Sequence, residues 1–200
     1  MKIQYQKIEN GLEILRIWQD SGIIKVPEQI EGIPVIRIAP YTFSLHKDEE
    51  EKNASVYQTE TGEEDDRFAQ PEELCCGGMV REIHLPATVQ SIGNYAFYGC
   101  MNLKLFHGTD AIVRMGSGVF TGCRLEKVEI GARCFCDSEG RFEVSDCAKL
   151  RNVRLGDGCC VNWKSFVMKN CDSIQEVSIG DGCFVNCENT VFESESSGIR

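Results

Sequence analysis

The chain has 200 residues, of which 42% are hydrophobic, and its 21 Lys and Arg against 31 Asp and Glu give a net charge of −10. This length suits one large domain or two small ones, and no apolar run approaches the roughly 18 residues that a membrane span requires. An acidic chain without a basic stripe is repelled by phosphate, which argues against nucleic acid as a partner.

The N-terminal residues show no signal peptide. MKIQYQKIENGLEIL alternates polar and apolar residues and contains no continuous apolar stretch. We therefore predict a cytoplasmic protein, with secretion or the cell surface as the alternative if a leader has been removed.

Residues 1–21 are predicted to form a β-hairpin cap. YQKIENGLEILRI has the pattern of two short alternating strands joined at Asn10-Gly11, a dipeptide that accepts the positive φ angles of a tight turn. A stack of repeats requires such an end piece, because an uncovered terminal repeat leaves apolar side chains and strand edges facing water.

Residues 22–192 repeat with a period of about 24 residues. Cys100, Cys123, Cys147 and Cys171 are 23, 24 and 24 residues apart, and LRNVRLGDGCCVNWKSFVMKNC is followed by the similar IQEVSIGDGCFVNCENTVF. A period of roughly 20–29 residues with a Leu/Ile-x-x-Val-x-Ile core is typical of leucine-rich repeats. We predict one solenoid of about six repeats, followed by a polar tail at residues 193–200.

An acidic insertion interrupts the first repeat at residues 46–74. It holds eleven Asp and Glu against three Lys and Arg, a local net charge of −8, which leaves −2 for the rest of the chain. Such a composition cannot offset the entropy lost on ordering, so we predict a flexible loop. The alternative is a recognition element for a basic partner or a cation, although the carboxylates lack the spacing of an EF-hand.

The segment LPATVQSIGNYAFYGCMNL resembles the BspA-like leucine-rich-repeat family in its Leu-Pro, Val-x-x-Ile-Gly and Ala-Phe-x-Gly-Cys pattern. The resemblance covers most of residues 22–123. It implies a right-handed curved solenoid with a parallel β-sheet on its concave face. The expected fold class ranges from α/β to mostly β. It also implies adhesion or protein-interaction roles and no shared catalytic residues. Many relatives are secreted or displayed on the cell surface.

Strand alternation separates a buried row from an exposed row in each repeat. In VREIHLP, Ile83 and Leu85 point inward, and Glu82 and His84 point outward. Five phenylalanines recur at nearly the same phase and are predicted to form a second internal spine: Phe43, Phe97, Phe120, Phe142 and Phe166.

The twelve cysteines are interpreted mainly as free buried thiols. Cys100, Cys123, Cys147 and Cys171 form one predicted column, with one thiol per repeat packing as a small hydrophobe. The second predicted column is Cys134, Cys159 and Cys183. Disulfides and a metal site remain alternatives, but the cysteine spacings do not match zinc-ligand motifs. This many thiols fits a reducing compartment.

The outward row supplies the candidate binding surface. If Phe106 occupies the place of Ile83, then His107 stands beside His84, and the next rungs present Glu129. Two imidazoles and a carboxylate could coordinate a transition metal, so His84, His107 and Glu129 are an alternative metal site. The predicted concave binding face comprises Lys25, Glu82, His84, His107, Lys127, Glu129, Asn152, Arg154, Glu176 and Ser178.

Enzyme motifs are missing from the sequence. There is no Gly-x-Ser-x-Gly turn or phosphate loop, and the Gly-Asp-Gly triplets at 156–158 and 180–182 recur with the repeat, as turns do. We predict a non-enzymatic scaffold without a cofactor, which binds an unidentified protein through its concave face. The alternative is a structural segment of a longer array that self-associates through its open C-terminal edge.

Overall fold

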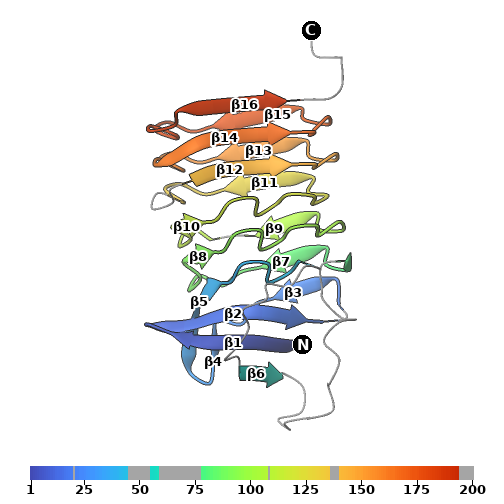
Figure 1. Ribbon diagram of the computed structural model, residues 1–200, viewed down its shortest axis with the longest axis vertical. Helices are drawn as coiled ribbons and strands as arrows, with labels where there is room; N and C mark the ends of the chain where they lie inside the picture. The colour runs from blue at the N-terminus through green and yellow to red at the C-terminus, as the bar shows by residue number, and fades with distance from the viewer. Residues whose placement is uncertain (20, 45–54, 59–77, 108, 136–139, 194–200) are drawn as a thin grey trace.

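The computed structural model describes residues 1–19, 21–44, 55–58, 78–107, 109–135 and 140–193 (Figure 1). Within these ranges the chain is a β-solenoid of about six turns with almost no helix. The strands rise from the N-terminal hairpin to the C-terminal rung, each turn lying above the previous one (Figure 1). The predicted fold class ranged from α/β to mostly β, and the described structure is mostly β.

The N-terminal hairpin consists of β1 (Lys2–Ile8) and β2 (Gly11–Trp18), which pair in antiparallel fashion. Ile8 pairs with Gly11, so the turn is Glu9-Asn10 and lies one residue before the predicted Asn10-Gly11. Asn10 has the positive φ, 69°. Gly11 already belongs to the strand, where a Cβ would lie 2.7 Å from the backbone oxygen of Pro34.

The hairpin is part of a larger sheet. β2 pairs in parallel with β5 (Ile33–Ile38), and β1 pairs with β6 (Ser55–Gln58). β4 (Gln29–Ile30) adds to the other side of β5. The predicted flexible insertion, 46–74, lies outside the described residues except for β6 and its pairing with β1.

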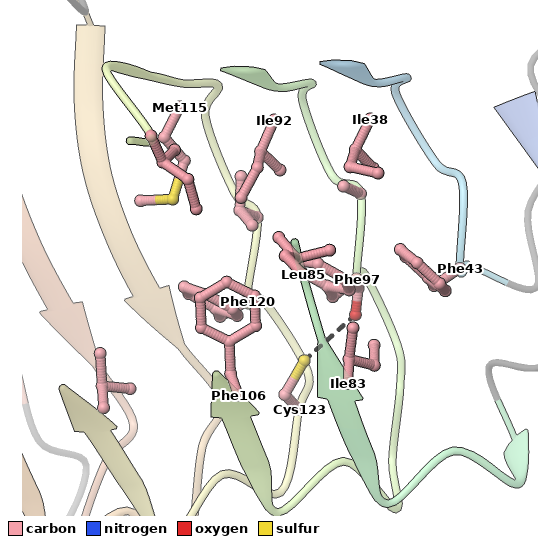
Figure 2. Close-up of a cluster of buried hydrophobic side chains, with 14 of the residues drawn as sticks. Ile38, Phe43, Ile83, Leu85, Ile92, Phe97, Phe106, Met115, Phe120 and Cys123 are labelled. Carbon is pink, nitrogen blue, oxygen red and sulfur yellow. Dashed lines mark hydrogen bonds between the residues drawn. The ribbon is translucent and has the colours of Figure 1, made fainter. Parts of the chain in front are cut away.

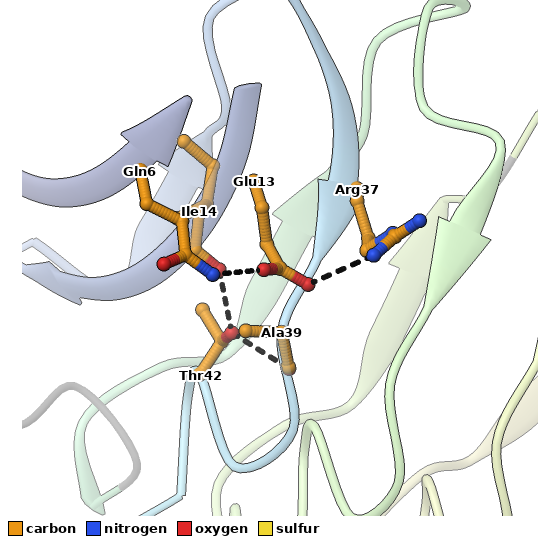
Figure 3. Close-up of polar contacts among 6 residues, drawn as sticks. All are labelled: Gln6, Glu13, Ile14, Arg37, Ala39 and Thr42. Carbon is orange, nitrogen blue, oxygen red and sulfur yellow. Dashed lines mark hydrogen bonds and ion pairs between the residues drawn. The ribbon is translucent and has the colours of Figure 1, made fainter. Parts of the chain in front are cut away.

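Polar side chains join the hairpin to the first repeat. Figure 3 shows the Thr42 hydroxyl, which is fully buried and donates to the carbonyls of Ile14 and Ala39 at 3.1 and 2.8 Å. The buried guanidinium of Arg16 donates to the carbonyls of Tyr41 and Ser44 at 2.8 and 2.7 Å. Three of these four carbonyls, those of Ile14, Ala39 and Ser44, belong to buried residues, where such bonds take the place of water.

Two walls of parallel strands form the body of the solenoid. On one wall β3 (Ile23–Lys25), β7 (Glu82–His84) and β9 (Leu105–His107) form one sheet. Above them β11 (Lys127–Ile130), β13 (Asn152–Leu155) and β15 (Glu176–Ile179) form a second sheet (Figure 1).

The opposite wall also has two parts. β8 (Ser91–Ile92) and β10 (Arg114–Met115) continue the sheet of β5, and β12 (Gly140–Ser145), β14 (Trp163–Lys169) and β16 (Asn189–Glu193) form the upper sheet. The apolar core lies between the two walls.

The observed register agrees with the alignment of the repeats made from the sequence. Ile24 pairs with Ile83, and Ile83 pairs with Phe106, so the irregular third repeat keeps the expected phase. The side chains of Ile24 and Ile83 are fully buried, and that of Phe106 is 8% exposed. Burial at this scale contributes roughly 1.5–3 kcal/mol for each large aliphatic side chain and stabilises the stack.

The predicted phenylalanine spine is wrong in one respect, because it divides into two stacks. Phe43, Phe97 and Phe120 stack with ring centroids 4.9 and 5.6 Å apart, and Figure 2 shows these three rings in one row. Phe142 and Phe166 form a separate stack at 5.3 Å. Phe142 lies two residues before Val144 on the same face of β12, which moves its ring out of the first row.

The first cysteine column is present, and its hydrogen bonds show which residues occupy equivalent positions in successive rungs. Each thiol donates to a carbonyl one rung earlier: Cys100 to Phe43, Cys123 to Phe97, Cys147 to Phe120 and Cys171 to Val144, at 3.4, 3.1, 3.3 and 3.5 Å. The bond from Cys123 is the dashed line in Figure 2. Val144 therefore takes the place that phenylalanine holds in the earlier rungs.

Candidate functional site

The candidate site is the surface formed by the outward side chains of β3, β7, β9, β11, β13 and β15, here called the strand face. Side chains alternate along a β-strand, so every second residue of these strands points away from the core. Lys25 pairs with His84 and His84 with His107, and two rungs further on Glu129 pairs with Arg154 and Arg154 with Ser178. A second outward column contains Lys127, Asn152 and Glu176.

The upper part of the strand face contains a hollow of about 340 Å³. It spans the paired strands β11, β13 and β15. Its lining consists of Lys127, Glu129, Asn152, Val153, Arg154, Glu176 and Ser178. Six of these seven residues belong to the binding face predicted from the sequence. The seventh, Val153, is a core residue that is 1% exposed, so the pattern of outward residues did not include it.

Charges of both signs meet around this hollow. Lys127 Nζ lies 2.7 Å from Glu129 Oε1 on the same strand, and both side chains are about half exposed. Asn152 Nδ2 donates to Glu176 Oε2 at 3.2 Å. Within the part of the chain that the structure describes, the guanidinium of Arg154 makes no hydrogen bond or ion pair. Its donors are therefore available to a carboxylate on a partner.

The alternative metal site stays a prediction, because the side chain of His107 lies outside the described part of the structure. His84 and His107 are register partners, as predicted, but β9 and the strand of Glu129 belong to different sheets. His84 Nε2 lies 2.7 Å from Glu82 Oε1. No group of three metal-binding side chains occurs among the described residues, from which the side chain of His107 is excluded.

Two apolar residues on the strand face were missed by the sequence reasoning, which listed mainly polar outward positions. Ile23 and Leu105 are 43% and 42% exposed and flank Glu82 in register. Their outward position follows from the same alternation that places Glu82 there, so the pattern contained the information. They make the lower part of the strand face more apolar than the upper part.

The described cysteines lie in or against the apolar core and not on the strand face. Nine of them are described, and all nine are free thiols. Burial raises the pKa of the Cys123 thiol to about 12. In the second column, a hydrogen bond from the Cys134 thiol lowers the pKa of Cys159 to about 7. The same kind of bond, from the Cys147 thiol, lowers the pKa of Cys171.

The Gly-Asp-Gly triplets are turns, as predicted, and they stack on one another. Asp157 Oδ1 accepts a hydrogen bond of 3.0 Å from the backbone N–H of Asp181, one rung later. The carbonyl of Asp181 accepts a bond of 2.8 Å from the N–H of Gly158. These groups are used in joining two rungs, which explains the recurrence of the triplet.

The rungs of about 24 residues, the parallel walls and the polar outward face define a leucine-rich-repeat solenoid. Residues 72–198, more than half of the chain, match the model of the family described as "BspA type Leucine rich repeat region (6 copies)". The chain therefore belongs to the BspA-type leucine-rich-repeat family. The first repeat precedes the matched span, but β3 and β5 continue its walls in register.

Solved structures with a similar architecture come from three bacteria. The leucine-rich repeat protein of T. pallidum shares 21% identity over 93% of this chain and 86% of its own, with a TM-score of 0.52. A leucine-rich repeat protein from Bacteroides ovatus ATCC 8483 shares 16% identity over 96% and 52% of the two chains, with a TM-score of 0.41. The first of these likenesses supports the fold.

A third structure is a leucine-rich cell surface protein from Faecalibacterium prausnitzii A2-165, with 12% identity over 89% and 75% of the two chains and a TM-score of 0.33. No curated protein matches this chain. Among the described residues, no helix has the length and apolar character needed to cross a bilayer.

Proposed function

We propose that the protein is a non-catalytic interaction scaffold that binds a protein partner through the strand face. The observation that supports this proposal best is the hollow on β11, β13 and β15, six of whose seven lining residues are outward side chains of strands in register. Repeat solenoids present long, rigid surfaces of this kind. We further propose that this wall is the concave side of a right-handed curve.

Arg154 is proposed as the anchoring residue of the hollow. It pairs in register with Glu129 on one side and Ser178 on the other, at the centre of the three strands. A guanidinium can hold a carboxylate through two parallel hydrogen bonds. We therefore expect the partner to present an Asp or Glu side chain to Arg154.

The ion pair beside Arg154, between Lys127 and Glu129, is expected to contribute more to specificity for the partner than to binding affinity. Lys127 and Glu129 are half exposed, and exposed pairs contribute only about 0–1 kcal/mol. Charges at the rim of an interface chiefly guide association and exclude partners of the wrong charge pattern. A partner of this face should therefore associate more slowly as salt is added.

Charge reversal on the strand face tests the proposal. The full-length chain with Glu129→Lys and Arg154→Glu keeps its net charge, so a change in binding reports the pattern of charge. We expect capture of cross-linked partners from the source cell to fall about tenfold, which corresponds to about 1.4 kcal/mol. The readout is quantitative mass spectrometry of the captured proteins.

A matched control carries the same reversals on other surfaces. Glu28 lies between β3 and β4, and Arg114 is on β10 of the opposite wall; both are exposed. The control with Glu28→Lys and Arg114→Glu should retain full capture. If the strand-face variant captures the same proteins as the wild type, or the control loses them equally, the strand face is not the contact.

The compartment is a separate prediction. The nine described cysteines are free thiols, which fits a reducing compartment, whereas membership of the BspA-type family fits the alternative of secretion or the cell surface.

A further inference from the structure

Both strands of the C-terminal rung, residues 172–193, are edge strands. β15 lies at the end of the sheet β11-β13-β15, and β16 lies at the end of β12-β14-β16 (Figure 1). Among the described residues, no strand pairs with the outer side of either one. An edge strand offers a row of backbone N–H and C=O groups to any extended segment that approaches it.

The apolar side chains of this rung are also incompletely covered. Leu155 on β13 is 2% exposed, whereas its register partner Ile179 on β15 is 45% exposed. Val153 is 1% exposed, and its partner Val177 is only partly buried. Val185, in the turn that follows β15, is 66% exposed. Within the described residues, the last rung therefore presents an apolar surface beside an unpaired strand edge.

The charge of the C-terminal rung indicates what fits this surface. Residues 170–193 contain no Lys or Arg and five carboxylates, those of Asp172, Glu176, Asp181, Glu188 and Glu193. The preceding rung, residues 147–169, is the opposite: Lys149, Arg151, Arg154, Lys164 and Lys169 against the single acid Asp157. The C-terminal rung thus already packs against a basic rung on its inner side.

A second copy of this chain placed tail to tail is a poor occupant, because both C-terminal rungs are acidic. Two C-terminal rungs placed end to end would bring ten carboxylates together with no cation between them. Like charges opposed across an interface cost stability. At the N-terminal end, the edge strand β6 belongs to the segment 46–74, with a net charge of −8, whereas the edge strand β3 carries Lys25. A head-to-tail second copy is therefore an outcome that the sedimentation experiment below must test.

From these observations we propose that the outer edge of β15 binds an extended segment of another protein, in which apolar residues alternate with Lys and Arg. The segment adds one strand to the sheet through backbone hydrogen bonds. Its apolar side chains cover Val177 and Ile179, and its cations face the carboxylates of the C-terminal rung. This site shares β15 and Glu176 with the hollow of the strand face, but it uses the backbone edge of the strand and does not depend on the function proposed for the hollow.

The chain itself supplies a matched pair of probe peptides. KLRNVRLG, residues 149–156, contains β13, which pairs with the inner side of β15, and it carries three basic residues. SIQEVSIG, residues 173–180, has its apolar residues at the same positions and a net charge of −1. Fluorescence anisotropy of each labelled peptide with the full-length chain measures whether the rung selects for positive charge.

We expect KLRNVRLG to bind at least about tenfold more tightly than SIQEVSIG, and to lose that advantage as salt screens the charges. Ile179→Lys should weaken the binding of KLRNVRLG by about tenfold, since it removes apolar contact and adds repulsion. Leu105→Lys is the control, because Leu105 is equally exposed, at 42%, but lies on β9. Both exposed positions tolerate lysine without loss of the fold, which circular dichroism would verify.

Four results would overturn the proposal: no binding of KLRNVRLG, equal binding of the two peptides, unchanged binding to Ile179→Lys, or equal loss in Leu105→Lys. Sedimentation of the chain alone supplies a fifth. A dimer that Ile179→Lys abolishes would show that a second copy occupies the rung. The variant with Glu129→Lys and Arg154→Glu should bind KLRNVRLG normally, so failure here is distinguishable from failure of the strand-face proposal.

Discussion

The recurring cysteine acts as a hydrogen-bond donor as well as a small apolar side chain. Each thiol of the first column lies in the core and donates to a carbonyl one rung earlier, as Cys123 does to Phe97 at 3.1 Å. An alanine would fill part of the same space but would leave that carbonyl without this donor. Because burial raises the pKa of Cys123 to about 12, the thiol keeps its proton at neutral pH.

The raised pKa of Cys123 predicts that the cost of Cys123→Ala, the loss in free energy of unfolding, depends on pH. In the unfolded chain the thiol ionises near pH 9, and in the folded chain near pH 12, so the folded state binds the proton more tightly between these values. The stability that the thiol contributes is therefore fully present below pH 9 and falls by up to about 1.4 kcal/mol per pH unit above it. The cost of Cys123→Ala should shrink accordingly as the pH rises.

Urea unfolding of the wild type and Cys123→Ala below pH 9 and near pH 10 checks this prediction. Val119→Ala is the control, since Val119 is 1% exposed and does not titrate. Its cost should stay constant over the same range. A cost of Cys123→Ala that does not change with pH would show that this thiol ionises alike in both states.

At the scale of elements, the attachment of the hairpin to the first repeat depends on buried polar contacts. Arg16 on β2 is 4% exposed, and its guanidinium donates to the carbonyls of Tyr41 and Ser44. Arg37 on the neighbouring β5 is 45% exposed in its side chain, with Nη1 3.8 Å from Glu13 Oε1 (Figure 3). The same residue type thus occupies two very different environments on adjacent strands.

We expect Arg16→Met to lower the free energy of unfolding by about 2–4 kcal/mol, because two buried carbonyls lose a charged donor. Arg37→Met should cost less, about 1 kcal/mol, because Arg37 is itself 45% exposed and its buried partner Glu13 keeps the hydrogen bond from Gln6. Chemical denaturation measures both. Equal costs would mean that the Arg16 bonds do not hold the hairpin in place.

At the scale of the whole molecule, the stability of each rung depends on its neighbours in the stack. Each rung pairs only with its neighbours in the stack, so a rung with one neighbour is less stable than a rung with two. The C-terminal rung has one described neighbour, and its apolar residues are more exposed than their partners in the preceding rung.

Native-state hydrogen exchange should therefore show a gradient of protection. The amides of β15 and β16 should exchange faster than those of β13 and β14, because local opening of the last rung exposes less apolar surface. Saturating KLRNVRLG should slow exchange in β15 if the edge binds as proposed. Uniform protection through the two rungs would contradict the rung-by-rung description.

The sequence alone was sufficient to predict a solenoid of about six repeats and the register of the strand face. Its period places one strand of each wall in every rung, and alternation then sorts inward from outward residues. For this reason the pairing of Phe106 with Ile83 and of His107 with His84 could be predicted although the third repeat is irregular. The BspA-type family was recognisable from the same residues.

Other features depend on distances that a repeat pattern does not contain. A period of 24 residues does not say which side chains fill the gap between the walls, and so Phe142 and Phe166 were assigned to the wrong row. Nor does it say that the hollow lies on β11, β13 and β15, or that Arg154 has no partner within the described chain. The sequence determined the order and facing of the strands because those follow from local alternation. Tertiary structure decided the hollow and the two aromatic stacks, because each depends on how neighbouring rungs pack in space.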